Sequence, residues 1–431
     1  MPAVAAGDGQ ALASASAAVR RRLIPFLFLL YVFSYLDRVN VGFASLQMNA
    51  ELGFSASTYG FGFGIFFISY LLLEVPSNMI LARVGARLWI ARIMITWGVV
   101  SMAMMFITSA RMFYTLRFLL GAAEAGFFPG IIFYLTAWIP SSQRARTIAA
   151  FMTATLAAGV IGGPLSGALL TLHGAAGLSG WQWLFLLEGV PSCALGFIVL
   201  VVLVDRPDQA RWLSADEKAA LVAAVAREQS ATTVHGRSAS ASLASPVVWL
   251  LSASYFLLIP VALYAFGSWL PQIIRGSYRG GDFGVGLLSA LPYLAGAVAM
   301  VLVGQRSDRL QERRWHVAVS ALVSAAGFCA AAFVHGLAGS MIALTVAMAG
   351  LASTFGPFWG LATAIVNGAG AAAGIALINS VGNVGGFVGP YAVGYIRDAT
   401  QSFTDGLLFV AVTVAAGAVL VLAVPRESAL R

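Results

Sequence analysis

The chain has 431 residues, of which 60% are hydrophobic and only 10% are charged, and its net charge is +8. A soluble domain carries about 25% charged residues, so this composition excludes a soluble protein with a single core. Apolar runs of about 20 residues predict membrane-spanning helices rather than the short alternating strands of a barrel. The positive charge then concerns orientation in a lipid bilayer, and we expect no nucleic-acid partner.

Residues 1–22 form an N-terminal tail that is rich in alanine and serine and ends in Arg20, Arg21 and Arg22. A signal peptide would need its basic residues before the apolar region and a cleavage site after it, so we expect the first span to be retained. Twelve helical spans follow. They are 23–47, 58–82, 88–108, 111–138, 145–171, 182–204, 247–274, 284–304, 315–335, 340–366, 371–396 and 405–424. They divide into a six-helix half at 23–204, a six-helix half at 247–425 and a tail at 426–431.

A polar segment at 205–246 separates the two halves. Ser214 and Glu217 form a capping-box pattern before good helix formers, which predicts a short surface helix in what is otherwise a passive linker. With the N-terminus inside, 19 of the 25 lysines and arginines lie on the cytoplasmic side, 4 lie outside, and 2 lie within spans. Because positive charge accumulates in cytoplasmic loops, this predicts that both termini are cytoplasmic.

The two halves carry matching features at one offset. Arg83 and Arg309, Arg87 and Arg313, and Trp89 and Trp315 are each 226 residues apart, and so are Gly163-Pro164 and Gly389-Pro390. Two unrelated markers at one offset indicate a duplicated six-span unit. Duplicated halves around a central cavity are the architecture of secondary transporters.

The whole chain resembles the major facilitator superfamily, whose loop signature is G-x-x-x-D-R-x-G-x-R-R. The second copy here has Gly304, Asp308, Arg309, Arg313 and Arg314. The first copy keeps Arg83, Gly85 and Arg87, but Asn78 and Ala82 replace the glycine and the aspartate. The resemblance implies that these loops latch the halves by pairing arginines with carboxylates and helix ends.

Spans seven to twelve carry no charged residue near the middle of the membrane, whereas spans of the first half carry charged residues well inside them. These charged residues are Asp37, Arg38, Glu74, Arg117, Glu124 and Glu188. A charge at the bilayer centre costs roughly 3 kcal/mol or more, so such residues usually face a cavity or a partner. Arg117 and Glu124 share one face of their helix, whereas Asp37 points about 100° away from Arg38. We therefore expect a crossed network in which the first and fourth spans each give one acid and one base. The alternative is an ion-pair staple without a transport role.

A closer resemblance is to the anion:cation symporters, and among them to bacterial transporters of tartrate, hydroxyphenylacetate and sugar acids. The motifs that carry it are YLDRVNVGFA, YLLLEVPSN, RFLLGAAEAGFFPG, WQWLFLLEGVPS and WLPQII. The resemblance implies that Asp37 and Glu124 take up protons, that Arg38 and Arg117 serve substrate binding and coupling, and that Tyr35 and Tyr70 line the pocket. It also implies a functional monomer in a bacterial inner membrane, with protons as coupling ion and no other cofactor.

Residues of the second half complete the expected site. Asn379 and Asn383 lie on one helical face, where they either bind the substrate or join helices. Tyr264, Trp269 and Trp359 either pack against the substrate or serve only helix packing. Glu74 and Glu188 lie away from the centres of their spans, and we expect them to be structural. The cysteines and histidines indicate neither a metal site nor a disulfide.

Three functions compete at this stage. The first is import of a small organic carboxylate with protons. The second is a proton-coupled exporter of drugs or metabolites, but an exporter of cations should keep acids without paired arginines, and Arg38 and Arg117 argue against it. The third is a membrane-embedded enzyme or sensor. The sequence lacks a metal cluster, a nucleophile elbow and a phosphate loop, so we expect no enzyme.

Overall fold

The computed structural model describes residues 2–232, 244–366 and 371–425, and in these ranges every regular element is a helix. The helices of the first half are α1 (Pro2–Leu52), α2 (Ala56–Val84), α3 (Ala86–Ala103), α4 (Ala110–Glu124), α5 (Phe127–Thr136), α6 (Ser141–Leu170) and α7 (Gly180–Val202). The helix α8 (Ala215–Thr232) follows. The second half contains α10 (Pro246–Leu258), α11 (Pro260–Ser277), α12 (Asp282–Leu310), α13 (Arg314–Phe333), α14 (Leu337–Ile365), α15 (Ala371–Thr400) and α16 (Thr404–Ala423). Short 3-10 turns occur at Met104–Phe106, Ala175–Gly177 and Pro207–Gln209.

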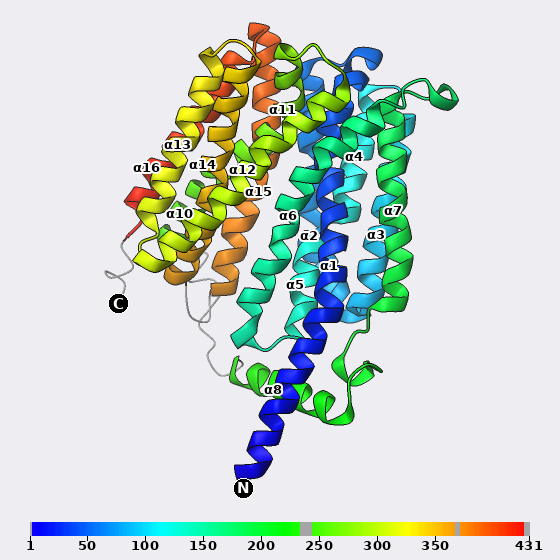
Figure 1. Cartoon of the computed structure of the whole chain (residues 1–431), viewed down its shortest axis with the longest axis vertical. Helices are drawn as coiled ribbons and strands as arrows, with labels where there is room; N and C mark the ends of the chain where they lie inside the picture. The colour runs from blue at the N-terminus through cyan, green and yellow to red at the C-terminus, as the bar shows by residue number, and fades with distance from the viewer. Residues whose placement is uncertain (1, 233–243, 367–370, 426–431) are drawn as a thin grey trace.

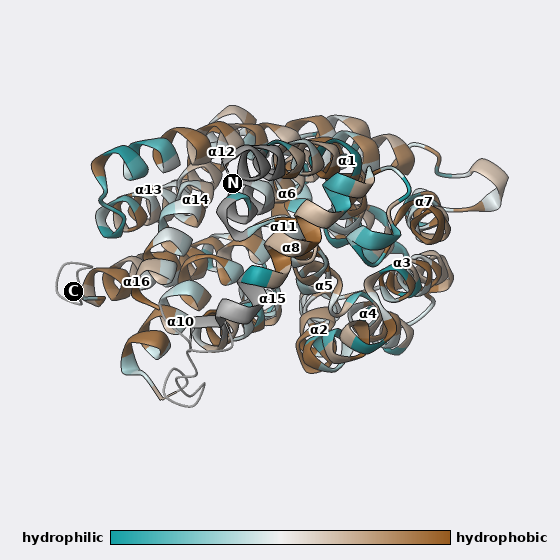
Figure 2. Cartoon of the chain, turned by 90° about the horizontal axis from the view of Figure 1, so that it is seen from below, coloured by the Kyte–Doolittle hydropathy of each residue, from teal (hydrophilic) through white to brown (hydrophobic). Residues whose placement is uncertain are grey.

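Eleven helical segments of the described chain are long and apolar enough to cross a membrane. The helix α15, which carries the expected span at 371–396, is not among these eleven. Large apolar side chains stay exposed on the bundle, such as Leu72 at 63% and Val201 at 85%. Figure 2 shows apolar residues over outward helices such as α7 and α16. Lipid, rather than water, suits this surface, and the prediction of an all-helical, multi-pass membrane protein is confirmed.

The N-terminal tail and the linker helix pack together. The tail is the first part of α1, which runs unbroken over 51 residues. The capping box predicted for α8 is present, since Ser214 N donates to Glu217 at 2.9 Å and Glu217 N donates to the Ser214 hydroxyl at 3.2 Å. The Ser14 hydroxyl donates to the same carboxylate at 2.6 Å. These bonds lower the pKa of Glu217.

Two of the expected spans are broken near their middle. The expected span 111–138 consists of α4 and α5, because Gly126 takes a left-handed φ of 85° that ends the regular helix. The expected span 247–274 consists of α10 and α11, which meet at Ile259 and Pro260. A proline cannot donate the helical hydrogen bond at its position, so the helix restarts there. The first break places Glu124 at the last residue of α4.

The two halves lie side by side and pack through three helix pairs. These are α2 with α15, α6 with α12, and α1 with α11. In Figure 1 the N-terminus and α8 lie at the lower end, and α1 runs from there to the upper end. The residues that join the halves lie toward the upper end, since they come from the end of α1, the start of α2 and the start of α12.

Glycines bring the backbones of the two halves together at that end, beside aromatic pairs such as Tyr59 with Trp269 and Phe61 with Phe387. A Cβ on Gly286 of α12 would lie 2.2 Å from the carbonyl oxygen of Gly163 on α6, and a Cβ on Gly60 of α2 would lie 2.5 Å from that of Pro390. A few hydrogen bonds add to this contact. The Tyr59 hydroxyl donates to Ser268 O at 3.0 Å, and Gln47 Nε2 donates to Asp282 at 2.7 Å. The backbones of the two halves therefore touch directly at this end.

We predict that Gly286→Ala weakens the contact between the halves. The added methyl group meets a carbonyl oxygen that cannot move aside, so we expect a loss of about 1–3 kcal/mol, as for other overpacked sites. Thermal denaturation of the purified protein measures it. Gly276→Ala is the matched control, because a Cβ there has nothing within 4 Å. Equal melting temperatures for the two variants would contradict the prediction.

Candidate functional site

A buried ion pair joins α1 to α4. Arg38 Nη2 lies 2.6 Å from Glu124 Oε1, and Arg38 Nε donates to the same oxygen at 2.9 Å. The Ser34 hydroxyl, one turn earlier on α1, donates to it at 2.8 Å. The side chain of Glu124 is 1% exposed and that of Arg38 is 13% exposed. The arginine is thus the member of the pair that a ligand can reach.

Aromatic side chains from both halves surround Arg38. Its guanidinium carbon lies 5.3 Å from the centre of the Tyr70 ring and 5.6 Å from that of Phe66. Tyr264 of α11 interacts with Arg38 through its side chain and packs on Phe67 with ring centres 4.2 Å apart. Tyr35, half-buried on α1, interacts with Tyr264 as well. Residues expected to line one pocket from the two halves are therefore neighbours here.

Asp37 lies in a different environment from Arg38. Its carboxylate accepts hydrogen bonds from Trp97 Nε1 at 2.5 Å and from Ser101 at 2.9 Å, both on α3. Asn40 donates to it at 3.1 Å, and Ser192 of α7 donates at 3.2 Å. Asp37 is 2% exposed. All four partners are neutral donors, and the sequence analysis identified none of them. Asn40, which lies three residues further along the same helix, was the one partner that the sequence could have indicated.

Arg117 is buried against the backbone of α2. It donates to Gly62 O at 3.2 Å and to Phe63 O at 2.9 Å, and its guanidinium carbon lies 4.9 Å from the centre of the Phe66 ring. No carboxylate of the described residues forms an ion pair with it. The crossed network is therefore half formed: Arg38 meets Glu124, but Asp37 and Arg117 do not meet.

The expected residues of the second half lie on α14 and α15. Trp359 packs on Tyr255 with ring centres 5.0 Å apart. Asn379 and Asn383 are half-buried. Within the described ranges neither side chain forms a hydrogen bond. They therefore do not join helices by hydrogen bonds in this conformation. Trp269, by contrast, is buried and donates to Pro390 O at 3.1 Å, which is a packing role.

The two signature loops bind helix ends within their own halves. Arg87 Nε donates to Leu200 O at 2.7 Å near the end of α7, and Arg314 donates to Val424 O at 2.9 Å just after α16. Arg313 donates to Gly360 O on α14. Gly85 takes a φ of 99° between α2 and α3. Arg83, Asp308 and Arg309 are exposed, and a Cβ on Gly304 would meet nothing within 4 Å.

Glu312 shapes the second of these loops. It accepts hydrogen bonds from Trp315 N at 2.7 Å and from His316 N at 3.2 Å, which caps the start of α13. Burial acts to raise the pKa of Glu312, but the hydrogen bonds from Trp315 and His316 outweigh it and leave that pKa below its usual value. The hydrogen bonds to Glu312 thus hold this loop in place. Like the first loop, it uses arginines to donate to backbone oxygens of helices in its own half.

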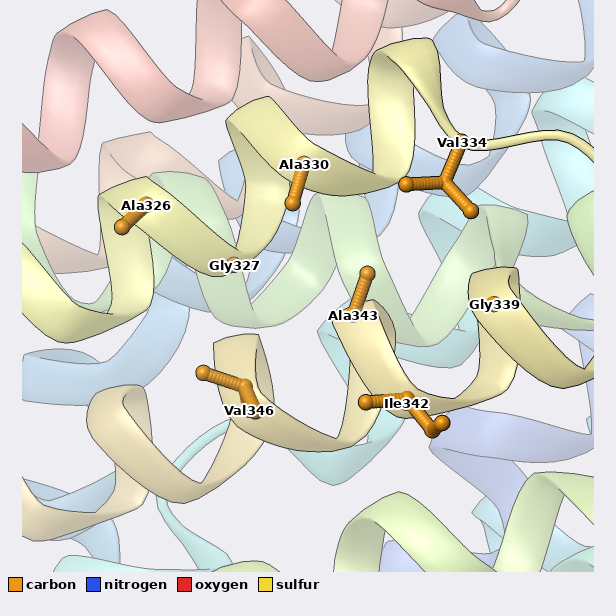
Figure 3. A pocket seen from close by; sticks show the side chains of 8 residues that line it. All are labelled: Ala326, Gly327, Ala330, Val334, Gly339, Ile342, Ala343 and Val346. Atoms are coloured by element: carbon orange, nitrogen blue, oxygen red, sulfur yellow. The ribbon is translucent and has the colours of Figure 1, made fainter.

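Other parts of the described chain do not resemble an anion site. A groove between α13 and α14 is lined by small and apolar side chains, among them Ala330, Val334 and Ile342, and no charged group (Figure 3). No group of three or more metal-binding side chains occurs in the part of the chain that the structure describes. Glu74 lies half-buried on α2 and interacts electrostatically with Arg38, but forms no ion pair with it within the described residues.

Comparison with known proteins gives consistent similarities. The family described as Major Facilitator Superfamily matches residues 27–390. A protein of Agrobacterium vitis named for tartrate transport is 49% identical over 94% of this chain and 90% of its own length. A quinolone resistance transporter of Acinetobacter baumannii is 39% identical over 93% and 92%. The crystal structure of a bacterial homologue of the lysosomal transporter Spinster, in an inward-facing and occupied conformation, has a TM-score of 0.77 with 17% identity over 96% and 97%.

We predict that Arg38→Gln destabilises the protein more than Glu124→Gln. The first change leaves a carboxylate that is 1% exposed without its cation, whereas the second leaves an arginine that is 13% exposed. Removing one partner of a buried pair costs about 3–5 kcal/mol, and the cost rises with the burial of the charge that stays. Melting temperatures measure the difference, with Glu74→Gln as the control for a half-buried acid. A larger loss for Glu124→Gln would show that the pair is not organised in this way.

Proposed function

This chain belongs to the major facilitator superfamily of secondary transporters, and from that premise we propose that it imports a small organic carboxylate together with protons by alternating access. It is a transporter and not an enzyme. The finer assignment of cargo and coupling depends on the residues at the centre of the molecule.

The observation that carries the proposal is the partly exposed guanidinium of Arg38 among tyrosines of both halves. A planar guanidinium binds a carboxylate through two parallel hydrogen bonds. Tyr70 and Tyr264 add hydroxyl groups and flat ring surfaces beside it. Cationic drugs would gain nothing from this arrangement, whereas an organic anion would be bound by both charge and shape.

Coupling follows from the pairing of Arg38 with Glu124. A substrate carboxylate at Arg38 competes with Glu124 for the same hydrogen-bond donors. A carboxylate that loses its cation in a buried site binds a proton more readily. Substrate and proton binding therefore support each other, as linkage requires. We propose Asp37 and Glu124 as the two proton-binding acids.

The second half would recognise the rest of the substrate. Asn379 and Asn383 offer side-chain amides that form no hydrogen bond with other described residues, and Trp359 offers an apolar surface. Amides of this kind suit the hydroxyl groups or second carboxylate of a hydroxylated diacid. We therefore propose a tartrate-like acid as the cargo, which agrees with the names of the Agrobacterium relatives.

The proposed setting is a bacterial inner membrane with both termini in the cytoplasm, and the carrier works as a monomer. In that orientation, the glycine contacts close the periplasmic end, and the structure corresponds to an inward-facing state. The signature loops around Arg83 and Arg309 lie at the opposite end. We propose that they latch the halves together only when that end closes.

Export is the second candidate, because a relative that is 39% identical is named for quinolone resistance. Reconstituted vesicles separate the two. Uptake of labelled tartrate into vesicles with an acidic exterior supports import. If the protein instead transports a quinolone out of the vesicles and does not transport tartrate or related acids, the import proposal fails.

We predict that Arg38→Lys lowers the affinity for the substrate at least tenfold. Lysine keeps the charge but loses the two-point geometry that a carboxylate requires. Substrate-induced shifts in melting temperature measure the affinity, because a ligand that binds only the folded state stabilises it. Arg117→Lys is the comparison. Arg117 contacts backbone carbonyls, so its variant should keep more of the affinity while losing coupling. Wild-type affinity in Arg38→Lys would mean that this guanidinium does not hold the substrate.

We also predict that Asp37→Asn and Glu124→Gln each abolish uphill uptake driven by a pH gradient. An amide cannot bind or release the coupling proton. Exchange of labelled for unlabelled substrate should survive in at least one of the two variants, since exchange does not require proton release. Vesicle uptake with and without the gradient measures both activities. Accumulation by both variants would place the coupling acids elsewhere in the chain.

A further inference from the structure

A second buried acid lies near Asp37, and neither the Arg38 pair nor the substrate site includes it. Glu188 of α7 is 3% exposed. Its Oε1 accepts a hydrogen bond from the Ser166 hydroxyl of α6 at 3.0 Å. The Ser192 hydroxyl, one turn further along α7, contacts both the Glu188 backbone oxygen at 3.4 Å and Asp37 Oδ2 at 3.2 Å. Glu188 and Asp37 thus belong to one polar cluster inside the first half.

Asn40 lies between the two acids. Its Nδ2 donates to Asp37 Oδ1 at 3.1 Å, and its side chain also interacts with the Glu188 carboxyl. Asn40 is 1% exposed. The two carboxyls are close enough to interact electrostatically. Asn40 therefore bridges an acid on α1 and an acid on α7.

By hydrogen-bond distance and angle, two buried acceptors in this cluster have no donor among the described residues. They are Asn40 Oδ1 and Glu188 Oε2. Buried polar atoms are almost always hydrogen-bonded, so two such atoms on interacting side chains need an explanation. What the cluster lacks is a donor, and a proton on one carboxyl turns an acceptor oxygen into one.

The charges of the cluster lead to the same conclusion. No lysine, arginine or histidine of the described residues forms an ion pair with Asp37 or Glu188. Two interacting carboxylates that share a buried site without a cation in ion-pair contact do not both stay ionised. One negative charge, spread over neutral donors such as Trp97 and Ser101, is what the site can hold.

We propose that Asp37 and Glu188 form a proton-binding pair bridged by Asn40, which holds one proton between its two carboxyls in this conformation. Glu188 is then a further proton-binding residue of the carrier. Whether Glu188 shares this proton does not depend on the identity of the cargo. The part of Glu188 in coupling rests on the function proposed above. The pair holds the coupling proton more firmly than Asp37 alone would, because release leaves two like charges side by side.

Other titratable groups near the pair belong to the first half. Glu124 of α4 interacts electrostatically with Asp37, and so does Arg117 of the same helix. Arg38, adjacent in sequence, is engaged by Glu124 at 2.6 Å. The facing side chains of α3 and α6 in the cluster are Trp97, Ser101 and Ser166, which do not titrate near neutral pH. Among the charged groups of the described chain, Glu188 interacts electrostatically with Asp37.

Infrared spectroscopy of the purified protein tests the proton directly. A protonated carboxylic acid has a C=O absorption that carboxylates and amides lack, and it shifts in heavy water. At neutral pH, we expect the wild type to show one such acid band from the pair. This band should be absent from Glu188→Gln or, if the proton then stays on Asp37, from the Asp37→Asn, Glu188→Gln double variant. Glu74→Gln is the matched control and should keep the band. An unchanged band in the Asp37→Asn, Glu188→Gln double variant would overturn the proposal, whatever the protein transports.

Transport then tests the role in coupling. The amide of Glu188→Gln can donate to an acceptor in place of the hydroxyl, so the variant should fold with a melting temperature close to that of the wild type. Its pH profile of uptake should move to lower pH, because Asp37 loses the neighbour that helps it hold a proton. Glu188→Leu should melt earlier, since it leaves Asn40 Oδ1 without a donor. A wild-type pH profile in a well-folded Glu188→Gln would reduce Glu188 to a packing residue and overturn its part in coupling.

If the acid band is lost but no carboxylate is transported at any pH, the proton pair stands and the proposed cargo is wrong. If carboxylate uptake is normal but the band and the pH profile are unchanged, the cargo stands and the pair is refuted. The two failures are therefore distinguishable.

Discussion

The ion pair between Arg38 and Glu124 is the constraint around which the first half is organised. An isolated charge in the bilayer is costly, and a buried pair is retained only where geometry and further hydrogen bonds compensate for lost hydration. Here α1 and α4 must lie close enough for a 2.6 Å contact, and Ser34 completes the hydrogen bonds to the carboxylate. The break at Gly126 ends α4 at Glu124 itself. The pair therefore fixes the contact between α1 and α4 at the helix end that Gly126 sets.

The opposite requirement applies between the halves, whose contact must be able to open. Glycines such as Gly163 and Gly286 let backbones touch, but they contribute no interlocking side chains at the contact. The hydrogen bonds across this end are few and lie at the helix ends, as with Tyr59 and Gln47. Packing of small residues in a membrane stabilises by close approach alone. Such an interface can separate as a unit without leaving a buried charge unpaired.

The sequence was sufficient for the features that depend on one helix or on repetition. Apolar length predicted the spans, the common offset of 226 residues predicted two related halves, and Ser214 with Glu217 predicted the start of α8. The pairing of Arg38 with Glu124 was also predicted, because helical geometry separates Asp37 from Arg38.

The rest required knowledge of which helices are neighbours. Trp97 and Ser101 reach Asp37 from α3, and Arg117 turns to the backbone of α2, which no periodicity within one helix can reveal. The breaks at Gly126 and Pro260 were missed for a related reason. A glycine or a proline in a membrane helix is tolerated wherever neighbouring helices satisfy the freed backbone groups, so its effect depends on packing.

Adjacent positions on α1 serve two chemically different environments, and this difference gives the helix its place in the mechanism. Arg38 is 13% exposed and lies among tyrosines of both halves, and we propose that an anionic ligand replaces Glu124 as its partner. Asp37, about 100° around the same helix, faces neutral donors inside one half, where a change of charge cannot be compensated by water. In the proposed mechanism, an anion at Arg38 would alter the electrostatic field along α1, while Asp37 stays buried among its neutral donors. A small rotation or shift of α1 would change both environments together, so we propose that this helix connects substrate binding at Arg38 with proton binding at Asp37.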